Sequence, residues 1–436
     1  MKQNPVKTEG REAGTIMLAA VGIVFALASL TLWMAAAVRA ELAGAAHGVA
    51  SRQVEQAARG ALRLALAELA ANPESRPLSY ASPLRVGNVE LWMLPPGSPE
   101  PDDYDEFAMR DEGSRLNINL VDLDVLRALP GMTEEAAAAI VAWRGSGAEV
   151  GGIDEYLLLP EPYRRKQGPF ETLDELLWVK GVSPELLYGA AAAETAFAAD
   201  FGDGRIRTSA SSAYPADNGL GHGWFDYITV YSRPPAIAPA GAGQEEAGRI
   251  EVNRASRRQL QELLQSVVES DQLNGMVDQV RAEQPFENLV DFFYSTGLTA
   301  NDFNRIAGRV TVGSSRAPGG ALNVNTAPRH VLLCLPGIGE IEADALLARR
   351  RADDHDPGTI VWIAEVLPRE TAVAIANLLA PESRQYSFDI LAVDDDGRAF
   401  RGFSAVVDAS ASPPRVIYWK DISYKASADF AARVGR

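Results

Sequence analysis

Side chains that could do chemistry are few in this 436-residue chain, and they are scattered. The one cysteine, Cys334, excludes a disulfide framework and a cysteine-based zinc or iron–sulfur site, so we expect it to be a small core residue. The four histidines lie far apart in the sequence, at His47, His222, His330 and His355. Since no glycine-rich phosphate loop, nucleophile elbow or HExxH motif is present, we predict no enzymatic activity.

Two acidic runs carry oxygen atoms of the kind that calcium prefers. One consists of Asp394, Asp395 and Asp396 before Gly397, and the other is the stretch Asp200-Phe201-Gly202-Asp203-Gly204. Neither run completes the spacing of an EF-hand, and acidic turns are mostly just solvated. Calcium at one of these runs therefore stays an alternative, and otherwise we expect no cofactor.

Two Leu-Pro-Gly turns, each followed by an Ala-rich helix, could in principle bind phosphate. They are Leu129-Pro130-Gly131 and the longer Leu335-Pro336-Gly337-Ile338-Gly339. The longer turn resembles the hairpin of the helix-hairpin-helix family, whose DNA-binding members hold a phosphate with hairpin amides assisted by Lys or Arg. Here Glu340, Glu342 and Asp344 follow the turn instead. A structural or protein-binding role is favoured, and DNA binding is the alternative.

The charge of the whole chain points the same way. Its 41 basic and 58 acidic side chains give a net charge of −17. A protein that holds nucleic-acid phosphates needs a positive field, so we expect no nucleic-acid partner.

The elements that would position these turns begin with a membrane helix. The run from Thr15 to Val38 contains no charged residue, and as a helix it would span about 36 Å, more than the roughly 30 Å of a hydrocarbon core. A signal peptide cleaved after Ala40 is the rival interpretation, but its apolar region is usually about 15 residues at most. Lys2, Lys7 and Arg11 precede the run and favour a cytoplasmic N-terminus.

The helix should continue beyond the membrane. Residues 40–71 contain no proline and are rich in good helix formers, and Asn72-Pro73 should end the helix. The apolar residues recur at spacings of three and four, which predicts one face packed on a globular domain. They are Val54, Ala58, Ala61, Leu62, Ala65, Leu66 and Leu69.

Three segments of the chain share a pattern of a short extended piece, an asparagine and an amphipathic helix. They begin at Arg115, Arg249 and Ala321, and their asparagines are Asn119, Asn253 and Asn325. Because asparagine is a favoured N-cap, we expect these three side chains to cap the helices that follow. Each segment is followed by a second pair of short helices, which gives three divergent all-α modules.

Short strands are predicted around and between these modules, from β-branched and aromatic residues beside acidic or glycine turns. They are 89–93, 107–109, 227–231, 387–393, 402–407 and 415–419. The last three are typical of an antiparallel meander, so we expect one small sheet with helical modules inserted into its loops.

Together these parts resemble the minor pseudopilins of type II secretion, the general secretion pathway protein K family. The resemblance implies a leader that ends at Gly14 before Thr15, and Ala19 stands where most pilins have glutamate. The segments 111–119, 170–176, 229–232 and 323–327 also fit the family. A prepilin leader that lacks a basic residue directly before Gly14, and an extra middle module, depart from its pattern.

The resemblance implies an α+β fold in which a long pilin-like N-terminal helix packs on a small antiparallel sheet, with a large all-α insertion of helix-hairpin-helix-like repeats. The anchor would include Thr15, Ala19, Trp33 and Val38. The expected division is 1–14 prepilin leader, 15–72 transmembrane and amphipathic helix, 73–112 first β part, 113–196 first module, 197–248 strand and linker, 249–312 second module, 321–382 third module and 386–436 C-terminal meander.

The resemblance also implies a role that is physical rather than chemical. The protein would be a single-pass inner-membrane protein of a Gram-negative bacterium, with its bulk in the periplasm. A prepilin peptidase would process it, and it would cap a short pseudopilus together with other minor pseudopilins, above the major pseudopilin. The alternative from another class is a membrane-anchored DNA receptor.

Overall fold

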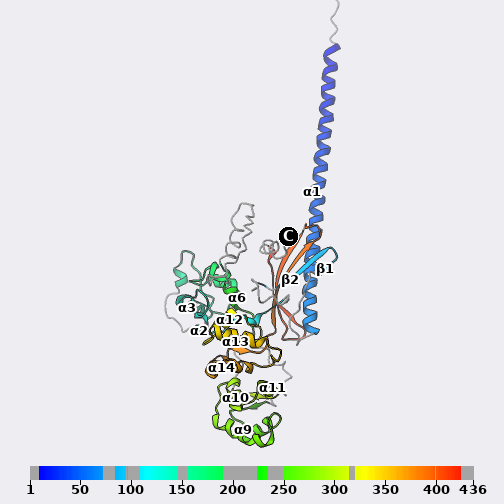
Figure 1. The fold of residues 1–436 in the computed structure, drawn as a ribbon. Helices are drawn as coiled ribbons and strands as arrows, with labels where there is room; N and C mark the ends of the chain where they lie inside the picture. The colour runs from blue at the N-terminus through cyan, green and yellow to red at the C-terminus, as the bar shows by residue number, and fades with distance from the viewer. Residues whose placement is uncertain are drawn as a thin grey trace, which may run out of the picture.

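The computed structural model describes residues 9–71, 84–94, 96, 109–145, 155–189, 223–233, 249–313, 320–397 and 399–423. Within these residues the chain forms one long N-terminal helix, a six-stranded antiparallel sheet and a set of short helices that lie between the strands β3 and β10 in the sequence. Figure 1 shows the helix standing beside the sheet, with the short helices on the other side. The predicted α+β, pilin-like architecture is confirmed.

The long helix α1 (Glu9–Ala71) is continuous over 63 residues. It ends where the sequence predicts, one residue before Asn72-Pro73, but it begins upstream of Thr15 and so includes the residues around Gly14. Its second half buries a stripe of small and aliphatic side chains, as expected. They are Ala50, Val54, Ala57, Ala58, Ala61, Ala65 and Leu69, with Leu62 and Leu66 half-buried beside them.

The sheet has the strand order β1-β2-β10-β11-β12, and β3 pairs with one end of β10. Its strands are β1 (Leu84–Val86), β2 (Val89–Leu94), β3 (Arg110–Asp111), β10 (Gln385–Asp394), β11 (Phe400–Asp408) and β12 (Arg415–Asp421). The predicted meander and the strand 89–93 are confirmed. In the predicted strand 107–109, Met109 lies outside any strand, and residues 107 and 108 lie outside the described residues.

One face of this sheet packs on α1. The helix contacts β2, β10 and β11, and their inward side chains form a single apolar core with the buried stripe of α1. Phe388 and Ile390 on β10 are fully buried in this core. Because alternate residues of a strand point to opposite faces, the sheet can bury one row against α1 and another against the helical modules.

The first module begins at β4 (Leu116–Asn117) and closes at β5 (Ile228–Thr229), which pairs with β4 in parallel. Between them lie α2 (Leu123–Arg127), α3 (Glu134–Trp143), η2 (Glu155–Leu158), η3 (Leu173–Trp178), α4 (Pro184–Tyr188) and α6 (Trp224–Tyr227), and η1 (Glu112–Ser114) precedes β4. The predicted strand 227–231 is therefore confirmed only at Ile228 and Thr229, and its expected place in the large sheet is wrong. Tyr227 ends a helix, and Ile228 and Thr229 pair within the module, outside the large sheet.

The second and third modules have the same kind of boundary. The second runs from β6 (Ile250–Glu251) through α8 (Arg257–Leu264), α9 (Ser270–Glu283), α10 (Leu289–Thr296) and α11 (Ala300–Ala307) to β7 (Val310–Thr311). The third runs from β8 (Leu322–Asn323) through α12 (Arg329–Leu332), α13 (Glu340–Arg350), η4 (Val361–Glu365) and α14 (Arg369–Ala376) to β9 (Leu379–Ala380). In both, the first and last strands pair in parallel.

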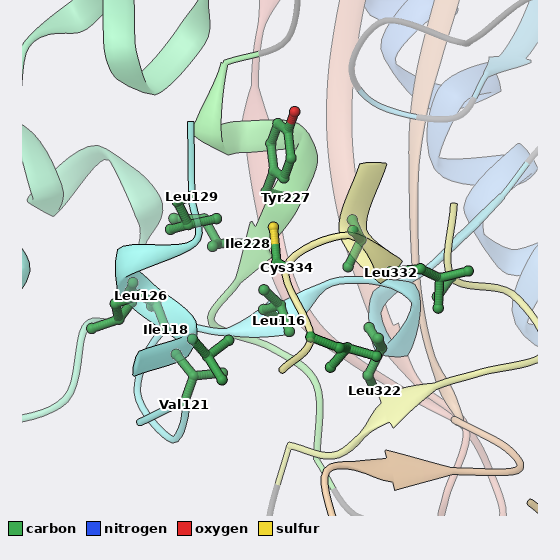
Figure 2. Packing of buried hydrophobic residues seen from close by; sticks show 14 of the residues in the cluster. Leu116, Ile118, Val121, Leu126, Leu129, Tyr227, Ile228, Leu322, Leu332 and Cys334 are labelled. Carbon is green, nitrogen blue, oxygen red and sulfur yellow. The ribbon is translucent and has the colours of Figure 1, made fainter. Parts of the chain in front are cut away.

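The first and third modules share one hydrophobic core, and the second has a separate core to which Val361 of the third module contributes. In Figure 2 Leu116 of the first module lies next to Leu322 and Cys334 of the third. Burial raises the pKa of the Cys334 thiol to about 12, so the thiol is uncharged at neutral pH. Its prediction as a small core residue is confirmed.

Candidate functional site

The first half of α1 presents apolar side chains to its surroundings. Phe25 is 74% exposed, Trp33 69% and Val38 50%, and Ala19 is exposed as well. Among the described residues, α1 is the one helix long and apolar enough to cross a membrane. Large contiguous apolar surface is unusual on a soluble domain, so this half of α1 fits a single-pass membrane anchor. Gly14 and Thr15 lie within α1, and their side chains lie outside the described part.

A largely buried polar cluster, in which Thr326 is exposed and Arg110 half-buried, joins the sheet to the first and third modules, and we name it the junction cluster. It consists of Arg110, Asp111, Glu112, Arg115, Asp226, Thr229, Asn323 and Thr326. Its residues come from three stretches of chain that are far apart in the sequence. These stretches overlap the segments 111–119, 229–232 and 323–327, on which the resemblance partly rests.

Asp111 links the sheet to the third module. Its Oδ2 accepts hydrogen bonds from Asn323 Nδ2 at 2.7 Å and from Thr326 Oγ1 at 2.6 Å, while its Oδ1 accepts one from Gly113 N at 2.7 Å. Burial raises the pKa of Asp111, and these hydrogen bonds oppose the rise. The carboxylate therefore fixes β3 and β8 to each other through several short polar contacts.

Glu112 and Arg115 link the same segment to the first module. Glu112 is fully buried, and its carboxylate accepts hydrogen bonds from the Arg115 guanidinium and from the Thr229 hydroxyl. Arg115 also donates to the Phe225 carbonyl at 2.9 Å and lies over the Phe225 ring. A buried charge pair needs such additional partners to offset its desolvation.

Arg110 and Asp226 form a second buried ion pair, with 3.4 Å between the guanidinium and the carboxylate. Burial lowers the pKa of Arg110, Arg115 lowers it further, and Asp226 raises it. The pair attaches β3 to α6 of the first module. The junction cluster therefore sets how the helical modules are oriented on the sheet.

The shared asparagines are not helix caps, which corrects the sequence-based expectation. The N-cap positions of the helices that follow are Asp122, Ser256 and Pro328, three residues further along, and of these three side chains that of Ser256 accepts a capping hydrogen bond. Asn119 instead accepts from Phe170 N at 2.7 Å and donates to Phe170 O at 2.9 Å. Asn253 holds Phe286 in the same way, at 2.7 and 3.0 Å.

The asparagine of the third module has different partners. Asn325 donates to the carbonyl of Pro381 at 2.7 Å and to that of Pro357 at 3.1 Å. In all three modules, then, the asparagine ties the first strand to a distant loop. It acts as a clamp on tertiary structure, which a local capping preference does not reveal.

Removing one clamp should loosen its module. We expect Asn253→Ala to lower the free energy of unfolding by about 1–3 kcal/mol, because the Phe286 amide and carbonyl lose their partner. Hydrogen exchange of the second-module amides measures the effect. Asn274→Ala is the matched control, since Asn274 is exposed and bonds only Gln261, and it should change the exchange little. Equal exchange in the two variants would show that the clamp has no structural role.

Both Leu-Pro-Gly turns are tight hairpins that open a helix. Gly131 and Gly337 have φ angles of +68° and +75°, a left-handed conformation that favours glycine. Leu129, Leu335 and Ile338 are buried in the shared core.

Backbone groups at these hairpins already form hydrogen bonds with side chains of the protein itself. Gly339 N donates to the Glu342 carboxylate at 3.0 Å, and Thr133 Oγ1 accepts from Ala136 N at 3.1 Å. Trp224 Nε1 donates to the Pro130 carbonyl at 2.8 Å. A carboxylate at the position where a phosphate would bind makes the third-module hairpin unsuited to an anion.

The calcium candidates lie at the end of β10 and in the turn that follows it. Asp394 is buried and accepts a hydrogen bond from Ala399 N at 2.7 Å, and Asp395 pairs with Arg85 at 2.5 Å. Asp396 is exposed. In the part of the chain that the structure describes, no three His, Cys, Asp or Glu residues are grouped so that they could hold a metal ion. Residues 200–204 lie outside that part.

Among known proteins, likenesses were found only in solved structures, and one of these is described below. No protein-family model matches the chain, and no curated protein matches it. Its structure is similar to one in the GspK-GspI-GspJ complex of the type 2 secretion system of enterotoxigenic Escherichia coli, with 10% sequence identity and a TM-score of 0.40. The similarity covers 85% of this chain and 96% of the other. A likeness of this degree does not by itself establish a shared function.

Proposed function

We propose that this protein is a non-enzymatic minor pseudopilin that helps to initiate and cap the pseudopilus of a type II secretion system. The observation that carries the proposal is the single helix α1. Its first half exposes apolar side chains suited to lipid, and its second half packs on the sheet. This is the arrangement expected of a subunit that is stored in a membrane and later packed into a filament.

The helical modules support a position at the tip. The first and third modules are attached to the sheet through the junction cluster, and in Figure 1 the modules lie toward the end of the molecule opposite the apolar half of α1. A bulky head in that place leaves α1 free to pack with subunits below it while it obstructs any subunit above. Ala19 supports the same position, because no carboxylate is present there to pair with the amino terminus of a neighbour.

The proposal includes partners and a cellular location. The partners are other minor pseudopilins, of the kind represented by GspI and GspJ in the similar complex, and the major pseudopilin. A prepilin peptidase would cleave after Gly14, and the mature chain would sit in the inner membrane with its modules in the periplasm. No observation favours the DNA receptor over this role.

Processing provides the first test. After co-expression with a prepilin peptidase, we expect the mature chain to begin at Thr15. Gly14→Val should leave the chain uncleaved, whereas Gly22→Val, inside the apolar run, should be cleaved normally. N-terminal sequencing measures all three. A mature terminus at Glu41 would instead identify a secretory signal peptide and overturn the proposal.

A further inference from the structure

The chain enters and leaves the second module at the same place. The first and last strands of the module, β6 and β7, lie side by side, and Ile250 N donates to the Arg309 carbonyl at 2.7 Å. Just beyond β7, Gly313 N donates to the Glu251 carboxylate at 2.9 Å. The module is therefore closed at its own base, as a domain inserted into another one is.

The apolar contact between the second and third modules consists of few side chains. Among the described residues, Val361 of the third module is buried in the core of the second, with Ala364 packed against that core. In return, Val290 of the second module is buried in the core shared by the other two, with Tyr294 packed against it. When the contact between two parts of a chain is small, relative motion of the parts is the default expectation.

Polar side chains also link the two modules. Asn288 of the second module donates from its Nδ2 to the Val373 carbonyl of the third at 2.8 Å. Asn304 donates from its Nδ2 to the Asp356 carboxylate at 2.6 Å. Unlike a packed apolar core, groups of this kind can exchange their partners for water when the two surfaces separate.

Arg369 brings a charge to this boundary. It is the first residue of α14, and its guanidinium pairs with Asp291 at 2.9 Å and with Glu283 at 3.4 Å, both in the second module. The guanidinium also lies over the Tyr294 ring, 5.4 Å from the ring centre. Since the Arg369 side chain is 44% exposed, salt can screen these attractions.

We propose that the second module is a movable arm and that Arg369 is the latch that holds it in the docked position. Undocking separates Arg369 from its two carboxylates and exposes Val361 to water. The paired strands β6 and β7 keep the module closed while it moves. The proposal goes beyond the proposed function, because it concerns the shape of the head and requires no partner.

Thiol labelling of the full chain in phosphatidylcholine nanodiscs tests the arm. Val361→Cys places a thiol at the boundary between the modules, and Val277→Cys places one inside the core of the second module. The native Cys334 reports on the core shared by the first and third modules. We expect the thiol of Val361→Cys to react with a maleimide at least about tenfold faster than the other two, because undocking exposes it without unfolding either core. Peptide mass spectrometry locates the label, and slow reaction of Cys334 in the same molecule shows that the chain has remained folded.

A second substitution tests the latch. Arg369→Gln, added to Val361→Cys, should raise the labelling rate of the boundary thiol about five- to tenfold and leave the other two thiols unchanged. High salt should raise the rate in the same direction when Arg369 is present. Arg257→Gln is the matched control, because it breaks an equally exposed ion pair with Asp278 inside the second module, and it should leave all three rates unchanged.

Two kinds of result would overturn the proposal. If the thiols of Val361→Cys and Val277→Cys react at the same rate, the second module leaves the third only by unfolding, and it is not an arm. If Arg369→Gln leaves the boundary thiol unchanged, or speeds the reaction of all three thiols alike, Arg369 is not the latch.

Discussion

Replacing Arg115 with methionine is expected to lower the free energy of unfolding by about 3–5 kcal/mol. Arg115 and Glu112 are both almost fully buried, with side chains 4% and 1% exposed. Without the guanidinium, Glu112 loses its ion pair and keeps the Thr229 hydroxyl as a hydrogen-bond partner, with Arg110 as the remaining cation that acts on it electrostatically. Urea denaturation of the full chain in detergent, followed by tryptophan fluorescence, measures the change.

Two further variants separate the buried pair from a general effect of losing an arginine. Arg127→Met removes an exposed arginine that pairs with Asp124 and Glu134, and should cost less than about 1 kcal/mol. Adding Glu112→Gln to Arg115→Met removes the remaining buried charge and should recover part of the lost stability. If Arg115→Met costs no more than Arg127→Met, the junction cluster does not stabilise the head.

Placing an aspartate at Ala58 is expected to separate the second half of α1 from the sheet. Ala58 is 0% exposed in the core between α1 and the sheet, where a carboxylate would find neither water nor a cation. We expect a loss of more than about 3 kcal/mol. Limited proteolysis after Ala71, together with urea denaturation, shows whether the helix has been released.

Ala67→Asp is the matched control for this change, since Ala67 lies on the same helix but is exposed. It should leave both proteolysis and the free energy of unfolding nearly unchanged. If the two aspartates have the same effect, α1 gains its stability from the helix itself rather than from its packing on the sheet.

The parts of the fold that could be predicted from sequence depend on local patterns. The spacing of Val54, Ala58, Ala61 and Ala65 identified the buried side of α1, and alternation with acidic turns identified β10, β11 and β12. Such patterns can be recognised in the sequence because an amphipathic helix or strand must bury its apolar face, whichever element packs against it.

The junction cluster and the clamps could not be derived in this way. Asp111 bonds Asn323 and Glu112 bonds Thr229, and no periodicity reports a contact between residues so far apart in the chain. Asn119 shows the same limit, because its preference for a helix start gives no sign of Phe170. Strands of two residues, such as β5, are also too short to show alternation.

The connectivity of the sheet affects how the protein can fold. β2 pairs with β10, Leu94 opposite Asp389, and every helical module lies between these strands in the chain. The two strands that pair within each module are nearer to each other in the sequence, so a module can form early. The sheet forms only after the C-terminal strands are present, and its formation costs more loop-closure entropy. Until the last part of the chain arrives, the apolar stripe of α1 has only β1 and β2 to cover it. A chain truncated before β10 should therefore keep folded modules on a helix prone to aggregation.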